Sequence, residues 1–98
     1  MTETIESIAH WQYNTFGMGP VRQVFFRALE EIGELAKVIR DNPSDEKQIA
    51  TETADVIITL TGILLTCQRL SAVDEKMAIN REREWRSNGD GTGYHIKR

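Results

Sequence analysis

Five carboxylates in two short clusters are the residues of this 98-residue chain best suited to do chemistry. Glu34 follows Glu30 and Glu31 by four and three positions, and Asp55 follows Glu52 by three. On a helix these spacings place the side chains on one side, about one turn apart. If the two helices form an antiparallel hairpin, the clusters can converge. Oxygen ligands of this kind suit a hard divalent cation such as Mg²⁺ or Mn²⁺.

Asp55 strengthens the expectation of a metal site because its neighbours, residues 54 and 56–58, are apolar. A buried carboxylate is costly unless it is paired or binds a metal. The alternative for Asp55 is an ion pair with Arg22 or Arg27. The alternative for the three glutamates of the first cluster is a solvated helix face, since Glu is a good helix former, but that alternative leaves Asp55 unexplained.

Four helices are predicted to position these side chains, and strand signals are scarce. Apolar residues recur every three or four positions in the second helix, and Pro20 precedes its start. Ser44, with two acids after it, favours the start of the third helix, and Ser71 is a plausible N-cap of the fourth. The predicted helices cover about residues 5–13, 21–40, 45–69 and 71–85.

The chain is predicted to be a single domain, residues 1–98, with a helical core at about 5–86. Residues 87–98, which contain three glycines, are expected to form a loop or mobile tail. The third helix is apolar almost all round, so more than one neighbour must cover it. The expected fold class is therefore all-α, a four-helix bundle that completes its core by oligomerisation.

Composition and charge argue against several classes of protein. Residues 1–75 carry twelve acids and six Lys or Arg, whereas residues 76–98 carry three acids and six Lys or Arg. This split does not match the broad basic face of a nucleic-acid-binding protein. The single cysteine fits a cytoplasmic location, no signal peptide is visible at the N-terminus, and the apolar run at 53–68 is too short for a membrane span.

The acidic motif also resembles a known family. Glu30-Glu31-Ile32-Gly33-Glu34, seventeen residues, and then Glu52-Thr53-Ala54-Asp55 match the E-E-x-x-E…E-x-x-D pattern of the MazG-like, all-α nucleoside triphosphate pyrophosphohydrolases. The resemblance extends over about Val21 to Trp85. It implies a MazG-like helical bundle and a hydrolase that releases pyrophosphate from a nucleoside triphosphate, leaving the monophosphate.

The resemblance implies a role for each acid. Glu31, Glu34, Glu52 and Asp55 would hold Mg²⁺, with Mn²⁺ as a possible substitute. Glu30 would be an accessory ligand or would orient the attacking water, so Glu30, Glu31 and Glu34 are the candidate catalytic residues. Mg²⁺ neutralises phosphate charge and lowers the pKa of a bound water, and a nearby carboxylate can accept the proton.

The fourth predicted helix supplies candidate substrate-binding residues. Lys76, Asn80 and Arg83 share one face, and the segment resembles the K-x-x-x-N-R sequence that follows the acidic motif in the family. Lys and Arg suit phosphate oxygens, and the Asn amide can both donate to and accept from a base edge. The alternative is that these cations only balance neighbouring surface acids.

Aromatic side chains could stack on the base of a nucleotide. Trp11 and Trp85 are the preferred candidates, and core packing is the alternative for both.

The predicted function is thus a Mg²⁺-dependent (d)NTP pyrophosphohydrolase acting in nucleotide-pool house-cleaning, as a homodimer or homotetramer. The alternatives are a dUTP- or dCTP-selective pyrophosphatase of the same superfamily and a non-catalytic helical oligomerisation module.

Overall fold

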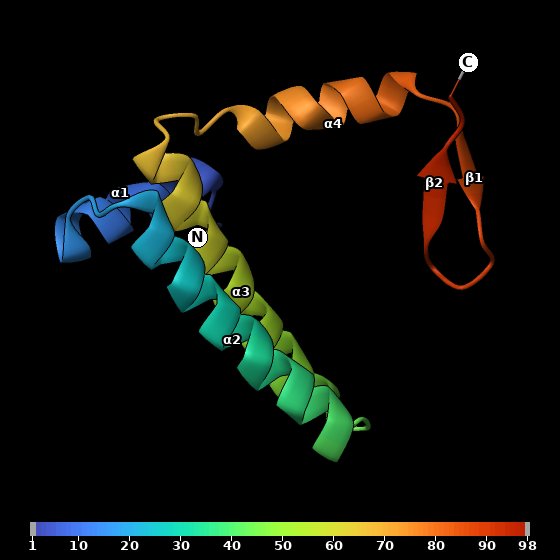
Figure 1. Cartoon of the computed structure of the whole chain (residues 1–98), viewed down its shortest axis with the longest axis horizontal. Helices are drawn as coiled ribbons and strands as arrows, with labels where there is room; N and C mark the ends of the chain where they lie inside the picture. Colours follow the sequence, from blue (N-terminus) through green and yellow to red (C-terminus); the bar gives the residue numbers. More distant parts are fainter. Residues whose placement is uncertain (1, 98) are drawn as a thin grey trace.

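The computed structural model describes residues 2–97, and within them it contains four helices and one two-stranded hairpin (Figure 1). The predicted all-helical class with four helices is confirmed, with the hairpin as an addition. The elements are α1 (Ile5–Phe16), α2 (Val21–Asp41), α3 (Glu46–Thr66), α4 (Ala72–Glu82), β1 (Trp85–Ser87) and β2 (Gly93–His95).

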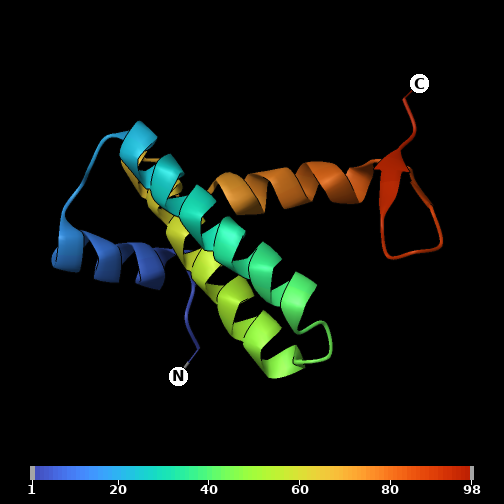
Figure 2. The ribbon, with the colours of Figure 1, turned by 60° about the horizontal axis from the view of Figure 1, so that its bottom comes forward.

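The α2 and α3 helices form an antiparallel hairpin that is the body of the molecule (Figure 2). Asp45 is the N-cap of α3, where its carboxylate accepts from the backbone N–H of Gln48, so the cap lies one residue after the predicted Ser44. The helices approach closely at Gly62, which is buried. A Cβ on Gly62 would lie 3.0 Å from Cγ1 of Val24 on α2, so this glycine permits the close packing.

The α1 helix lies across the upper end of this hairpin and packs against α3. Thr4 and Ser7 form a reciprocal capping box at its start. Gln12 is buried, and its Nε2 donates to the carbonyl oxygen of Ile58 at 2.6 Å, while its Oε1 is buried without a partner in residues 2–97. The Thr66 hydroxyl donates to the carbonyl of Gly19, which joins the start of α2 to the end of α3.

Replacement of Gln12 by Glu is expected to destabilise the docking of α1. The new carboxylate would face the Ile58 carbonyl with no donor between them, and an unsatisfied buried acceptor costs about 1–3 kcal/mol, more when it is charged. Gln12→Leu is the control, because it removes the orphaned Oε1 together with the donor and should change stability by less than about 1 kcal/mol. Urea unfolding followed by circular dichroism would measure both, and equal stability of the two variants would refute the assigned contact.

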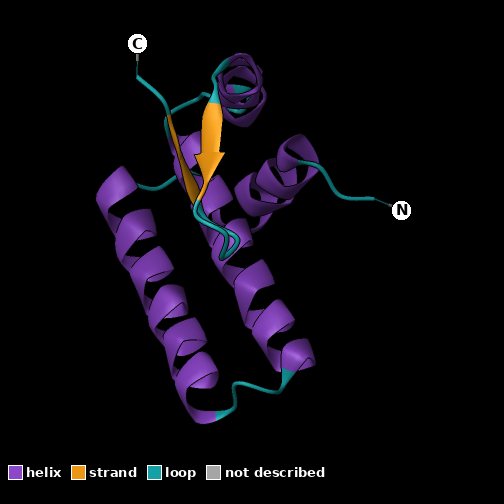
Figure 3. Cartoon of the chain, turned by 90° about the vertical axis from the view of Figure 1, so that its right-hand side faces the viewer, coloured by secondary structure: helices purple, strands orange, loops and turns teal. Residues whose placement is uncertain are grey.

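The C-terminal region differs most from the prediction. The α4 helix ends at Glu82, not near Trp85, and the expected loop or mobile tail contains a β-hairpin instead. Figure 3 shows the two short strands in orange beside the end of α4. Trp85 pairs with His95, and Ser87 pairs with Gly93. We refer to α4 together with this hairpin as the C-terminal arm.

Two backbone constraints explain why the segment turns. Gly89 and Gly91 have positive φ angles of 84° and 89°, which other residues rarely adopt. A Cβ on Gly93 would lie 2.6 Å from the carbonyl oxygen of Arg86, so only glycine fits at that position of the ladder. Asp90 secures the turn by accepting from the backbone N–H of Thr92, which also holds the pKa of Asp90 below its ordinary value, together with the Thr92 hydroxyl as the larger cause.

A single chain buries very little apolar surface. The buried hydrophobic residues within 2–97 are Ala9, Ala28 and Val38, and no large side chain among them is fully buried. The expectation that the apolar run is too short for a membrane span is wrong on length, because α3 has 21 residues and a stretch with a mean hydropathy of 1.5, of which only 11% is buried within the chain. The core helix of a soluble protein meets the same criterion. The prediction that α3 is covered by other chains therefore stays a prediction.

Candidate metal centre

Glu31 is the one acidic residue within 2–97 that is buried. It projects from α2 toward α3, and its side chain is only 8% exposed. Arg27, one turn earlier on α2, contacts Glu31 Oε1 through Nη2 at 2.6 Å and Glu30 Oε2 through Nη1 at 3.0 Å. Glu31 Oε2 is buried and has no hydrogen-bond partner in the described part of the chain. One oxygen of this carboxylate is therefore satisfied, and the other faces α3 unpaired.

Two acids of α3 meet Glu31 across the helix pair. One carboxylate oxygen from each of Glu31, Glu52 and Asp55 lies within 4.8 Å of the other two. Glu52 Oε2 is likewise buried without a partner in residues 2–97. Three carboxylates with oxygens this close repel one another, and an unpaired buried oxygen is costly, so a cation between them would lower the energy of the group. We call these three residues the acidic group.

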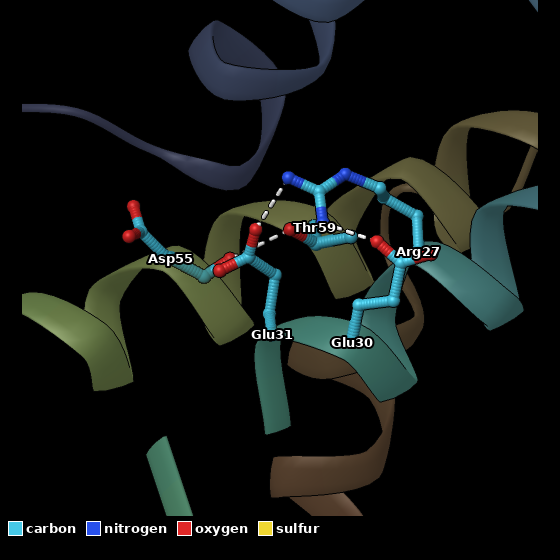
Figure 4. Close-up of polar contacts among 5 residues, drawn as sticks. All are labelled: Arg27, Glu30, Glu31, Asp55 and Thr59. Atoms are coloured by element: carbon cyan, nitrogen blue, oxygen red, sulfur yellow. Dashed lines mark hydrogen bonds and ion pairs between the residues drawn. The ribbon is translucent and has the colours of Figure 1, made fainter. Parts of the chain in front are cut away.

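The expectation that Asp55 is a buried aspartate is wrong, because Asp55 is exposed in the single chain. Asp55 and Arg27 lie on opposite sides of Glu31 (Figure 4). Glu31 is buried instead, and Glu52 is half-buried with its Oε2 out of contact with solvent. The alternative for Asp55, an ion pair with Arg22 or Arg27, is not found within residues 2–97, and Arg27 pairs with Glu30 and Glu31.

Glu34 and Glu30 do not join the acidic group. Glu34 is exposed and lies one turn further along α2, where it lines a shallow groove of about 270 Å³ together with Glu52 and Lys37. Glu30 is 68% exposed and points toward Arg27. The predicted four-ligand set is therefore reduced to three residues that meet, with Glu34 nearby, because the helix rotation directs only one glutamate of the cluster squarely at α3.

A larger cavity of about 460 Å³ opens beside the acidic group, between α1 and the upper half of the α2–α3 hairpin. Arg27 and Thr59 line this cavity, and Arg27 also belongs to the ion pair with Glu31. Trp11 lines it from α1 and is 54% exposed, in edge-to-face contact with Phe16 at 5.6 Å between ring centroids. The structure thus places the predicted base-stacking residue Trp11 in a cavity next to the acids.

The remaining predicted substrate-binding residues lie elsewhere. All four lie in the C-terminal arm: Lys76, Asn80 and Arg83 on or next to α4, and Trp85 on β1. The arm extends away from the α2–α3 helix pair in Figures 1 and 2. The Trp85 indole N–H donates to the carbonyl of Asn80 at 2.7 Å, and its ring packs edge-on against His95. Within one chain, these residues and the acidic group form two separate clusters.

His95 lies among the cations of the arm. Partial removal from water is the main cause that lowers its pKa below 6.5, and the charges of Arg83, Lys97 and Lys76 lower it further. The folded arm therefore binds a proton on His95 less readily than the unfolded chain does. Its contribution to stability is complete above about pH 6.5 and is lost as the pH falls through the lowered folded pKa.

Acidification from pH 8 to pH 5 is therefore expected to destabilise the β1–β2 hairpin. Hydrogen exchange at the amides of 85–87 and 93–95 should accelerate relative to α2 and α3, once intrinsic exchange rates are corrected for pH. The variant His95→Gln should lose most of this pH dependence because it cannot titrate. Faster exchange at pH 8 than at pH 5 would contradict the sign of the shift.

Three residues at the site do not follow from the sequence pattern used above. Arg27 enters there only as an alternative partner of Asp55, although its spacing of four from Glu31 is a helical ion-pair signal. Thr59 and Gln12 carried no signal of their own, because their places at the cavity depend on how α1 packs against α3.

Fold and geometry together define a small helical protein with a carboxylate cluster that could bind a cation. Comparisons with models of known protein families, with curated proteins and with solved structures find no match to this chain.

Proposed function

We propose that this protein is a Mg²⁺-dependent nucleoside triphosphate pyrophosphohydrolase that converts a (d)NTP to the (d)NMP and pyrophosphate. The observation that carries the proposal is the pair of buried carboxylate oxygens, Glu31 Oε2 and Glu52 Oε2, that find no donor among residues 2–97, together with the nearby carboxylate of Asp55. The donor set is all carboxylate oxygen, which suits a hard cation such as Mg²⁺ or Mn²⁺. The resemblance of the acidic motif to MazG-like enzymes supplies the reaction.

Each residue around the acidic group has a task in this proposal. Glu31, Glu52 and Asp55 would hold the metal, with Glu34 or water completing its shell. The metal, when bound, would neutralise phosphate charge and make a bound water more acidic. Asp55 is exposed, so it can also accept the proton of the attacking water. Arg27 orients Glu31 through the 2.6 Å contact with Oε1 and leaves Oε2 free for the metal.

The neighbouring cavity offers a place for the nucleoside. It is bordered by the half-exposed indole of Trp11, and stacking on such a ring contributes about 1–3 kcal/mol per base. Arg27 lines this cavity and also contacts Glu31 of the acidic group, so a nucleoside in the cavity would have its phosphates near the acids. We further propose a cytoplasmic homo-oligomer that removes unwanted nucleotides, with a dUTP- or dCTP-selective enzyme as the narrower version of the same function.

A substrate panel tests the proposal. The purified full chain is incubated with each canonical dNTP and NTP, and with dUTP, in Mg²⁺, and released pyrophosphate is quantified against released orthophosphate. Pyrophosphate with equimolar monophosphate is the expected product, and loss on chelation with return on adding Mg²⁺ is expected too. The absence of pyrophosphate for every substrate in both Mg²⁺ and Mn²⁺ would overturn the proposal.

A non-catalytic oligomerisation module is the second candidate, and the large exposed apolar surface of the chain favours it. The two candidates differ in their response to Mg²⁺ alone. A metal-binding enzyme is stabilised by RT ln(1 + [L]/Kd), so its Tm should rise with Mg²⁺ concentration. A module that only assembles should show a Tm that rises with protein concentration and not with Mg²⁺.

A further inference from the structure

The junction between α3 and α4 bends although no residue in it is a strong helix breaker. Residues 67–71 contain neither glycine nor proline, and positions 68–70 hold glutamine, arginine and leucine, which are good helix formers. Ser71, the predicted N-cap of α4, makes no capping hydrogen bond through its side chain. The local sequence is therefore compatible with one helix that runs from α3 into α4, whereas the structure divides the segment in two (Figure 2).

The bend is centred on Gln68. Its φ angle is 55°, the one positive φ angle at a non-glycine position in the described part of the chain. The N–H of Gln68 donates to the carbonyl of Leu65, and the N–H of Arg69 donates to the carbonyl of Leu64, both at 3.0 Å. This pair of bonds is a Schellman motif, which usually has glycine at the left-handed position. A residue with a Cβ is disfavoured there, because the Cβ comes too close to a carbonyl oxygen.

The backbone returns to a helical path within three residues of Gln68. Ser71 has φ −81° and ψ −1°, in the right-handed region, and its hydroxyl donates to the Glu75 carboxylate at 3.1 Å. The N–H of Ala72 donates to the carbonyl of Arg69 at 3.1 Å. Rotation of the backbone at residues 68–70 is therefore the change that separates the bend from a continuous helix.

Opposing contributions of similar kind act on this junction. The two hydrogen bonds of the Schellman motif favour the bend. A continuous helix would release Gln68 from its left-handed conformation and would give the first N–H groups of α4 carbonyl partners one turn earlier. The α4 helix has only eleven residues and packs closely on no other element within residues 2–97, so extension of a longer helix would also stabilise it. Each side amounts to a few hydrogen bonds, with no tertiary packing to decide between them.

We infer that residues 67–71 form a hinge with two states. In the bent state Gln68 is left-handed, and in the straight state α3 and α4 form one continuous helix over residues 46–82. The hinge sets where the cations of the C-terminal arm stand relative to the acidic group. In the straight state Lys76 lies about 30 Å from Asp55 along the helix axis, since a helix rises about 1.5 Å per residue. The hinge goes beyond the proposed function and does not depend on it.

Distance measurement between two spin labels by pulsed electron paramagnetic resonance tests the hinge. The full chain carries Cys67→Ala, so that the labels attach only at Thr51→Cys on α3 and Arg81→Cys on α4, both at exposed positions. Labelled chains are diluted in an excess of unlabelled chains, so that only distances within one chain are observed. We expect two distances, one near 45 Å for the straight state and a shorter one for the bent state. A single distance, short or long, would overturn the inference.

Two substitutions at Gln68 should shift the populations in opposite directions. Gln68→Gly removes the steric penalty of the left-handed conformation, so the ratio of straight to bent chains should fall at least about fivefold. Gln68→Val should raise that ratio at least about fivefold, because a β-branched residue is a rare outlier at positive φ.

Gln48→Val is the matched control, because it makes the same change of side chain within α3 and away from the hinge. Its distance distribution should match that of the parent chain. Identical distributions for Gln68→Gly and Gln68→Val would overturn the hinge, as would a shift in Gln48→Val as large as that in Gln68→Val. Pyrophosphate release is measured separately, so failure of the proposed enzyme activity leaves this result unaffected.

Discussion

Asp55→Asn is expected to reduce pyrophosphate release by more than about 100-fold, because loss of even an outer-shell partner of a metal costs about 10–100-fold and Asp55 is proposed as a direct ligand. The amide keeps the shape of the side chain but removes one of the three charges that face the cation. Because Asp55 is exposed, the folded structure should be unaffected. Initial rates at saturating Mg²⁺ and the Mg²⁺-dependent rise in Tm would both be measured, and both should fall together.

Glu46→Gln is the matched control for that experiment. Glu46 lies on the same helix, in the first turn of α3, and does not belong to the acidic group. The variant loses the same charge from the protein and should keep wild-type turnover. If Asp55→Asn retained full turnover, or if both variants lost activity equally, the assignment of the metal centre would be wrong.

Gly62→Val is expected to lower the free energy of unfolding more than the other substitutions proposed here. The first side-chain atom would already lie 3.0 Å from Val24 Cγ1 and within 3.8 Å of the Gln12 amide. Valine adds two further methyl groups there, and overpacking of this kind costs about 1–3 kcal/mol or more. The separation of α2 and α3 should increase, so the acidic group should open as well. Unfolding in urea measures the stability, and Mg²⁺ titration measures the site.

Gly33→Val is the control, because a Cβ at Gly33 meets nothing within 4 Å in this chain. Valine is a better helix former than glycine, so this variant should match or slightly exceed wild type in stability. A Gly62→Val protein as stable as Gly33→Val would show that the helices are not packed as closely as described.

The helices followed from local information. The apolar repeat and the start signals predicted α2 and α3 to within a few residues, since periodicity and caps depend on residues within one or two turns. The same reasoning missed the hairpin of the arm, whose strands are only three residues each. The turn residues Asn88, Gly89, Asp90 and Gly91 between two aromatic segments were the available signal.

The acidic clusters show where local information ends. The spacing of three between Glu52 and Asp55 correctly made them neighbours on α3, and the prediction that an antiparallel hairpin brings the two clusters together holds for Glu31. Which glutamate of α2 faces α3 depends on the rotation and register of the two helices. The burial of the acids also differs from the expectation: Asp55 is exposed and Glu31 is buried.

The sequence by itself determined the helical class, the positions of the long helices and the presence of closely spaced carboxylates, because those properties depend on neighbours a few residues apart. Only the tertiary structure decided that Glu31, Glu52 and Asp55 meet, that Glu34 lies a turn away, and that the cations of the arm stand apart from the acids. The physical reason is that close packing at Gly62 sets the register between α2 and α3, and such a contact joins residues far apart in the chain.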